Sequence, residues 1–379
     1  MKISPLWLFC LVASPACAGT LETDYALELN NYYGYTDYAK PYNRLHKQNN
    51  LNSSLNAYGR LTYEFNREYA ASLIGYFMID SAKEVENYNQ GIWGEEVYVL
   101  AETPFGEFSA GQNYNVAYAF AVGAPNVGAW RVNNTDLVNF IINPNWYKKG
   151  GRMSYKTLNS TYINTDGASP KVSYVTPEWQ GMKLGATFVP ETYSQSGLVA
   201  KDAPYKDKSA YILGAYGSWD VFGYELETSL GYADFDKNDK EYSAGISIYR
   251  KGWTLGASYR KTETSSSAYA LDKANLYDAY REGQAYNVGL SYAIGPFTTG
   301  IAYFDSKAEH IGNRDKIISF SNSWQYNKYV GFSLTAAHLE SKGADSLPEN
   351  NAKGYAFIFG LELKSVSYTH LTLPTNSRV

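Results

Sequence analysis

The chain has 379 residues, a formal net charge of −4 and only two cysteines, yet it contains 37 tyrosines. The small net charge argues against a nucleic-acid partner, because no cluster of Lys and Arg is dense enough to neutralise a run of phosphates. Aromatic residues make up 16% of the chain while the mean hydropathy is negative. This balance favours strands that are apolar on one face and wet on the other over a large soluble core.

The first 18 residues have the pattern of a secretory signal peptide. Lys2 supplies the positive start, residues 6–12 form a short apolar stretch, and Ala-Cys-Ala at 16–18 fits the cleavage pattern. The alternative is a lipoprotein signal in which Cys17 is acylated. Both cysteines lie inside this segment, so we expect the exported chain to fold without disulfides.

No later segment has the 18 or more consecutive apolar residues that a membrane-spanning helix requires. A chain of this kind can cross a membrane only as a closed barrel, because open strand edges would leave backbone groups unpaired in hydrocarbon.

The remaining sequence alternates with the period of two that is typical of strands. In residues 223–233, Leu226, Leu230 and two flanking tyrosines share one parity, while the other parity holds acidic, Gly, Ser and Ala residues. The same division recurs in 55–65, 241–248, 253–260, 286–292, 297–303 and 355–364, and none of these apolar faces carries a charge. In chain order the predicted strands are residues 20–32, 54–66, 69–78, 95–103, 106–112, 170–176, 181–190, 208–218, 222–234, 239–250, 253–262, 283–293, 296–305, 315–326, 329–339 and 354–364.

An uncharged face that ends in aromatic residues is what a lipid-facing strand needs. Tyr224 and Tyr232 lie eight residues apart, which at about 3.3 Å per residue and about 40° of tilt covers roughly 20 Å of membrane height. A soluble sandwich also alternates, but its outer face should carry Lys and Glu instead of Gly, Ser and Ala. We therefore predict an all-β, 16-stranded antiparallel transmembrane barrel with charged or small side chains facing a water-filled lumen.

Short turns and long loops alternate along the chain, as they do at the two rims of such barrels. The longest predicted loop is 113–169, and a connection of that length is usually functional. The other long loops are expected near 33–53, 79–94, 191–207, 235–238, 263–282, 306–314 and 340–353.

Residues 97–112 (VYVLAETPFGEFSAGQ) and 171–191 (KVSYVTPEWQGMKLGATFVPE), together with the order of strands and loops, resemble the general porins of Gram-negative bacteria. The resemblance implies a homotrimer of 16-stranded barrels whose long third loop folds into the lumen. It also implies a barrel domain at 19–364. A pore-facing Arg that many relatives carry is replaced here by Gln112, and residues 365–379 break the pattern and resemble a non-native tail.

The candidate pore-lining charges divide between the long loop and the barrel wall. Arg131, Asp136 and Arg152, with Lys148 and Lys149, lie in the loop. Parity places further charges on the lumen face of strands: Arg60, Arg260, Glu96, Glu102, Glu225, Glu227 and Glu362. The acids among them outnumber the arginines, which favours a mild preference for cations, although each residue is also explained as an ordinary solvated charge on a wet face.

An enzymatic role has little support in the sequence. The four histidines, at 46, 310, 338 and 370, have no metal-ligand spacing, and no serine lies in a nucleophile motif. Residues 234–238 begin like a calcium loop but lack its later ligands. We therefore expect no catalytic residue, metal or cofactor.

The sequence thus predicts a porin of the Gram-negative outer membrane that lets ions and small hydrophilic solutes diffuse passively. Its expected surroundings are outer-membrane lipid and lipopolysaccharide. Three alternatives stay open: a substrate-preferring channel, for example for sugars, because Tyr58 and Tyr98 would face the lumen; a barrel enzyme with an inward catalytic cluster; and an adhesin or receptor barrel with a closed lumen.

Overall fold

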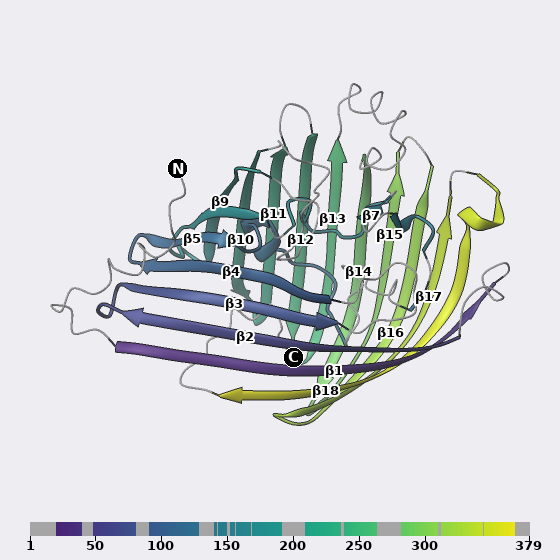
Figure 1. Cartoon of the computed structure of the whole chain (residues 1–379), viewed down its shortest axis with the longest axis horizontal. Coiled ribbons are helices and arrows are strands. Elements are labelled where there is room, and N and C mark those ends of the chain that lie inside the picture. Colours follow the sequence, from purple (N-terminus) through teal and green to yellow (C-terminus); the bar gives the residue numbers. More distant parts are fainter. Residues whose placement is uncertain are drawn as a thin grey trace.

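The computed structural model describes residues 20–39, 48–80, 91–128, 140–141, 143–149, 152–155, 157–167, 169–191, 209–235, 239–263, 282–309, 312–343 and 345–367. They form a closed barrel in which each strand pairs antiparallel with its neighbours along the chain, and β1 lies beside β18 to close the ring (Figure 1). The barrel strands are β1 (Thr20–Tyr38), β2 (Asn49–Glu64), β3 (Ala70–Asp80), β4 (Gly91–Thr103), β5 (Gly106–Gln112), β8 (Pro170–Val175), β9 (Met182–Val189), β10 (Ala210–Val221), β11 (Tyr224–Phe235), β12 (Asp239–Arg250), β13 (Trp253–Glu263), β14 (Gly283–Ile294), β15 (Phe297–Ala308), β16 (Arg314–Asn327), β17 (Val330–Lys342) and β18 (Ala352–Ser367).

The remaining elements of the described residues lie in two connections. Residues 113–169, here called the third loop, contain the short helix α1 (Val116–Ala119) and a separate hairpin of β6 (Trp146–Lys149) and β7 (Arg152–Tyr155). A 3-10 turn, η6 (Pro348–Asn350), precedes β18. No helix in the described part of the chain is long and apolar enough to cross a membrane.

The structure confirms the predicted barrel of sixteen antiparallel strands. The boundaries differ mainly at the long-loop rim, where β1 continues to Tyr38 and β2 starts at Asn49. The alternation continues there, with Tyr33 and Tyr35 exposed and Thr36 buried, but the polar composition of 33–53 resembles a loop. At the other end, β18 pairs with β1 as far as Ser367, and residues 368–379 lie outside the described part.

The register confirms which parity faces outward. On β11, Leu230 is 62% exposed and pairs with Ala215 and Ala244, whereas the adjacent Ser229 is only 7% exposed. Aromatic pairs mark both edges of the apolar band. Trp253 and Tyr292 lie 4.5 Å apart between ring centroids near the short turns, and Tyr232 and Tyr242 lie 5.5 Å apart nearer the long loops. Such belts place amphipathic rings at the two membrane interfaces.

At the long-loop ends of several strands, the inner face does not carry the charged or small side chains that the sequence predicts. Large apolar residues point inward there and are fully buried: Phe304, Ile317, Leu339 and Ile358 pack in one cluster with Phe140, Ile141 and Leu158 of the third loop. A second inner cluster joins Ala117 and Ile163 of the loop to Val189, Ile212 and Phe235 of the wall. These inward positions are apolar because the loop covers them, so part of the barrel interior is a packed core.

We predict that Leu230→Arg prevents barrel assembly, because a cation on the lipid face near mid-strand costs roughly 2–4 kcal/mol. The matched change Glu227→Arg lies on the inward parity of the same strand and should still assemble. Folding into detergent micelles or vesicles, followed by heat-dependent mobility on gels, measures both. Equal tolerance of the two arginines would contradict the register.

Candidate functional site

The first run of the third loop lies against the inner wall of the barrel. The backbone N–H groups of Val116 and Val122 donate to the inward-facing hydroxyls of Thr187 (3.1 Å) and Ser229 (3.0 Å). The loop therefore crosses the interior from β9 to β11 and continues toward β14.

Two wall glycines permit the close approach of the loop. A Cβ built on Gly245 would lie 1.9 Å from the Val122 carbonyl oxygen, and one on Gly256 would lie 2.1 Å from that of Gly123. Since real Cβ atoms do not come this close to backbone, any side chain at these positions would displace the loop.

Asn287 on β14 ties the outgoing and returning runs of the loop together. Its Oδ1 accepts from the Ala124 N–H at 3.0 Å, and its Nδ2 donates to the Thr161 hydroxyl at 2.8 Å. Ser258 on the neighbouring strand lies 2.6 Å from the same hydroxyl. Asn287 is 1% exposed, so these hydrogen bonds are made away from water.

The middle of the loop reaches the opposite side of the ring. The Tyr38 hydroxyl of β1 donates to the Phe140 carbonyl oxygen at 2.6 Å. Asn145 Nδ2 donates to Asp315 Oδ1 at 2.8 Å and to Ser341 Oγ at 2.9 Å. The described contacts of the loop thus extend from β8 through β17 to the end of β1.

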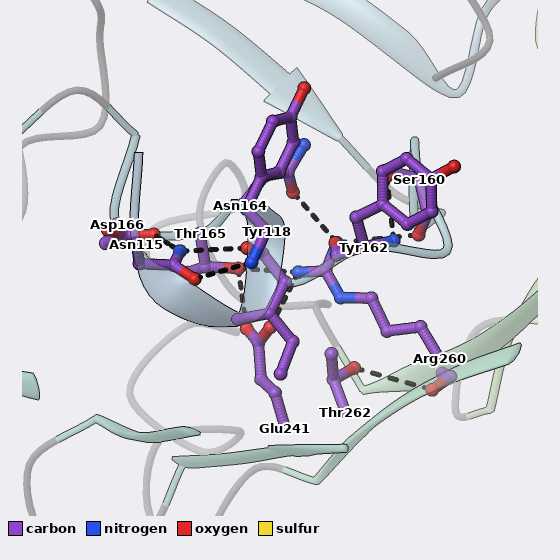
Figure 2. Close-up of polar contacts among 12 residues, drawn as sticks. Asn115, Tyr118, Ser160, Tyr162, Asn164, Thr165, Asp166, Glu241, Arg260 and Thr262 are labelled. Atoms are coloured by element: carbon purple, nitrogen blue, oxygen red, sulfur yellow. Dashed lines mark hydrogen bonds and ion pairs between the residues drawn. The ribbon is translucent and has the colours of Figure 1, made fainter. Parts of the chain in front are cut away.

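Arg260 on β13 holds the returning run of the loop (Figure 2). Its Nη1 donates to the Tyr162 carbonyl oxygen at 2.6 Å and to Asn164 Oδ1 at 2.8 Å, and its Nη2 donates to Thr165 Oγ1 at 2.7 Å. Nη2 also forms an ion pair with Glu241 Oε2 at 2.7 Å. The arginine is 2% exposed, so its guanidinium satisfies loop acceptors and one carboxylate and has little contact with the aqueous pore.

A second buried ion pair joins the two ends of the loop. Lys171 Nζ lies 2.9 Å from Asp166 Oδ2 and also donates to the Gly167 carbonyl oxygen at 2.8 Å. Asn115, which caps α1 by accepting from the Tyr118 N–H, donates to Asp166 Oδ1 at 2.6 Å. Burial raises the pKa of Asp166, while the charge of Lys171 and these hydrogen bonds act in the opposite direction.

The two arginines that parity placed on the lumen face, Arg60 and Arg260, have different surroundings in the structure. Arg60 on β2 keeps some contact with solvent and pairs through Nη2 with Glu102 Oε2 at 2.7 Å. Glu96 on β4 also faces inward, because it pairs with Tyr76 of β3, which in turn pairs with the inward-facing Tyr58 of β2. Arg260 faces inward as predicted but lies beneath the loop.

The structure describes only some of the charged residues that were predicted for the third loop. Arg131 and Asp136 lie outside the described residues. Arg152 lies in β7 and Lys148 and Lys149 in β6, where the structure describes the backbone hairpin. Sequence reasoning missed Glu241, Asp166 and Lys171 as anchors of the loop. Parity places Glu241 and Lys171 inward, but nothing in the sequence distinguishes a charge facing water from one facing the loop.

A profile described as Gram-negative porin matches residues 8–344 of the chain. The chain belongs to the Gram-negative porin family. The porin is an outer-membrane channel for the passive diffusion of ions and small hydrophilic solutes. A comparison with curated proteins gives no match.

Solved structures show the same fold at low sequence identity. They include OmpF of Salmonella typhi in complex with daunomycin (TM-score 0.62, 10% identity, covering 90% of this chain and 97% of that one). OmpT of Vibrio cholerae in a trimer form has a TM-score of 0.60 at 11% identity and covers 92% and 100%. An anion-selective porin from Comamonas acidovorans has a TM-score of 0.55 at 12% identity and covers 92% and 100%. At these identities the likeness concerns the fold.

We predict that Arg260→Ala destabilises the folded porin by about 3–5 kcal/mol, because Glu241 and three loop acceptors are left buried without their donor. Unfolding in guanidinium, followed by tryptophan fluorescence, measures the loss. Arg60→Ala is the matched control and should cost less, since its side chain is 18% exposed. The double variant Arg260→Met with Glu241→Leu should recover stability relative to Arg260→Ala. A single variant as stable as the native chain would contradict the anchoring role.

Proposed function

We propose that this porin prefers cations and that solutes pass between the third loop and the inner face of β1–β5. The observation that carries the proposal is the charge of the inner surface that keeps contact with solvent. Inward-facing acids with partial or full exposure are Glu22, Glu28, Glu64, Glu96, Glu102, Glu107, Asp220, Glu225, Glu227, Asp239 and Glu362. The corresponding basic residues of the described wall are Arg60, Lys183 and Lys364.

Most of these basic side chains are already neutralised by carboxylates. Arg60 pairs with Glu102, and Lys364 lies 3.4 Å from both Glu28 and Glu362. A cleft lined by one sign of charge within low-dielectric walls concentrates the opposite ion. The remaining negative charge therefore supports selection of cations, whatever the selectivity of porins that share only the fold.

The outer surface supports assembly with further copies of the chain. The adjacent strands β5, β8 and β9 are unusually short, with seven, six and eight residues. The other barrel strands have eleven residues or more, so the described wall is lowest at β5, β8 and β9. A neighbouring barrel packed against the outer surface of these short strands would shield them, in agreement with the homotrimer that the family resemblance implies.

Outward-facing basic residues near the long loops support contact with the anionic head groups of outer-membrane lipid and lipopolysaccharide. They are Lys240, Lys261, Lys307, Arg314, Lys316, Lys342 and Lys353. Phosphate groups at that height would find several cations on neighbouring strands.

We propose no catalytic role for the porin. In the described part of the chain, no group of three or more His, Cys, Asp or Glu residues is arranged to hold a metal ion, and His338 lies on the outward parity beside Tyr355. Release of fatty acid or peptide by the purified protein, tested with ester and peptide substrates, would overturn this part of the proposal.

Preference for a sugar is the second candidate, supported by two tyrosines. Tyr58 and Tyr98 face inward and are partly exposed, and rings of this kind stack on sugars in many binding sites. Saturable block of the ion current by millimolar maltose would favour it over general diffusion.

We predict that the porin in a planar bilayer with a KCl gradient shows a reversal potential of the sign expected for K⁺ permeation. The double variant Glu96→Gln with Glu107→Gln should lower the ratio of K⁺ to Cl⁻ permeability about twofold or more, because it removes two lumen charges. Glu340→Gln, on the outward parity of β17, is the matched control and should leave the ratio unchanged. A native channel that favours Cl⁻ would refute the preference.

A further inference from the structure

Three consecutive short turns of the barrel each hold a large aromatic side chain in solvent. They connect β4 to β5, β8 to β9 and β10 to β11, which are neighbouring hairpins in the ring. Phe105 is 70% exposed, Trp179 is 65% exposed and Phe222 is 94% exposed. Among the described residues, none of the three rings contacts another ring or a cation. These three turns are here called the aromatic rim.

Phe222 has a backbone conformation that a bulky residue rarely adopts. Its φ is +55°, in the left-handed region where glycine is tolerated and an aromatic residue is strained. Asp220 Oδ1 accepts a hydrogen bond from the Gly223 N–H at 3.0 Å and fixes the turn in this shape. A ring that is both strained at its backbone and fully exposed contributes nothing to the packing of the barrel itself.

Hydrogen bonds between neighbouring hairpins hold the aromatic rim in place. The Tyr174 hydroxyl of β8 donates to the Phe105 carbonyl oxygen at 2.6 Å. The Trp219 Nε1–H of β10 donates to the Gln180 carbonyl oxygen at 2.9 Å. The turns are therefore fixed relative to one another, so a partner that binds all three does not have to order them first.

A carboxylate lies within two residues of each of these rings. Glu107, Glu178 and Asp220 are exposed, and none of them forms an ion pair within the described part of the chain. The basic residue nearest to Glu178 in the register is Lys183, which also forms no ion pair. Since the three carboxylates outnumber this one lysine, the aromatic rim is negative as well as apolar.

The same end of the barrel shows how an exposed aromatic ring there takes a cation. The guanidinium carbon of Arg250 lies 4.2 Å from the ring centroid of Tyr224, and Lys328 Nζ lies 4.8 Å from that of Tyr329. The aromatic rim has the rings and the carboxylates without such cations. Lipid phosphates would be repelled by these carboxylates, whereas Arg or Lys side chains would be attracted to both the ring faces and the carboxylates.

We propose that the aromatic rim binds an extended basic segment of a periplasmic protein, whose Arg or Lys side chains lie against Phe105, Trp179 and Phe222. The short turns of such barrels face the periplasm. Two strand spacings separate consecutive turns, which is about 10 Å at about 4.8 Å per strand, and three residues of an extended chain cover roughly the same distance. The matching segment therefore carries a basic residue at about every third position.

Fluorescence anisotropy with the full-length porin in detergent micelles tests the proposal. The probe is a fluorescein-labelled peptide of Arg-Ser-Gly repeated four times, and the control peptide has the same composition with its four arginines consecutive. The repeating peptide should bind with a micromolar Kd, and the control should bind at least about threefold more weakly. Glu178→Gln and Phe222→Gly should each raise the Kd of the repeating peptide about fivefold.

Phe222→Gly also separates binding from folding. Glycine relieves the strained backbone at this position, so the variant should unfold at no lower guanidinium concentration than the native porin while it loses affinity for the peptide. A variant that unfolds more easily and binds the peptide as the native porin does would show that the ring serves the barrel and would overturn the proposal.

Two control variants test the location. Tyr326 is 62% exposed at the short-turn end of β16, outside the aromatic rim, so Tyr326→Ser should leave the Kd unchanged. Glu227→Gln removes a carboxylate that faces the lumen and should also leave it unchanged. A loss of affinity in Glu227→Gln equal to that in Glu178→Gln would place the peptide in the lumen and reject the docking surface.

Other results would also overturn the proposal. Equal binding of the two peptides would reduce the effect to general attraction between opposite charges, and no binding of either would reject the surface outright. If Phe222→Gly and Trp179→Ser lower the yield of folding into vesicles that contain phosphatidylethanolamine and leave peptide binding unchanged, the rings are lipid anchors. None of these measurements depends on ion selectivity, so the cation-preferring channel is tested separately by its reversal potential.

Discussion

The need to pair every backbone N–H and C=O group inside hydrocarbon determines the rest of this structure. A strand satisfies it only when both of its edges are paired, so the sheet must close, and β1 does close on β18 over fourteen register pairs from Tyr25 to Tyr38. Closure in turn fixes a lipid side and an inner side for every residue. The alternation of the sequence is the direct consequence, because lipid accepts Leu230 and excludes a charge there.

Closure alone would leave the wide interior to water, and the third loop changes this along β8–β17 and at the end of β1. It is held by two apolar clusters, by hydrogen bonds from its backbone to wall hydroxyls, and by the buried pairs Arg260–Glu241 and Lys171–Asp166. Breaking either pair would leave a charge without its partner in a site that excludes water, which is costly. The loop is therefore a fixed part of the channel wall, and the shape of the pore follows from where it is anchored.

The barrel was predictable from the sequence because its cause is local: period-two alternation, aromatic ends and short turns all act within about a dozen residues. The anchoring of the loop was not, because it depends on contacts between residues far apart in the chain. Asn287 and Thr161 are separated by 126 positions, and an asparagine on the inward parity of a strand looks equally suited to water. Phe304 and Ile317 show the same limit, since inward apolar residues make sense only once the loop is known to cover them.

Arg60 and Arg260 show why the field in the lumen cannot be obtained by counting inward charges. Both lie on the inner parity of their strands, yet only Arg60 keeps contact with the pore water, and it shares that position with Glu102. Arg260 is withdrawn beneath the loop and neutralised by Glu241. The anchoring that stabilises the loop thus withdraws Arg260 and Glu241 together from the pore water, and the open side of the channel lies on another part of the wall. What remains there is the carboxylate-rich face of β1–β5 and its tyrosines, so the interactions that position the loop also leave the passing solute beside a negative, aromatic wall.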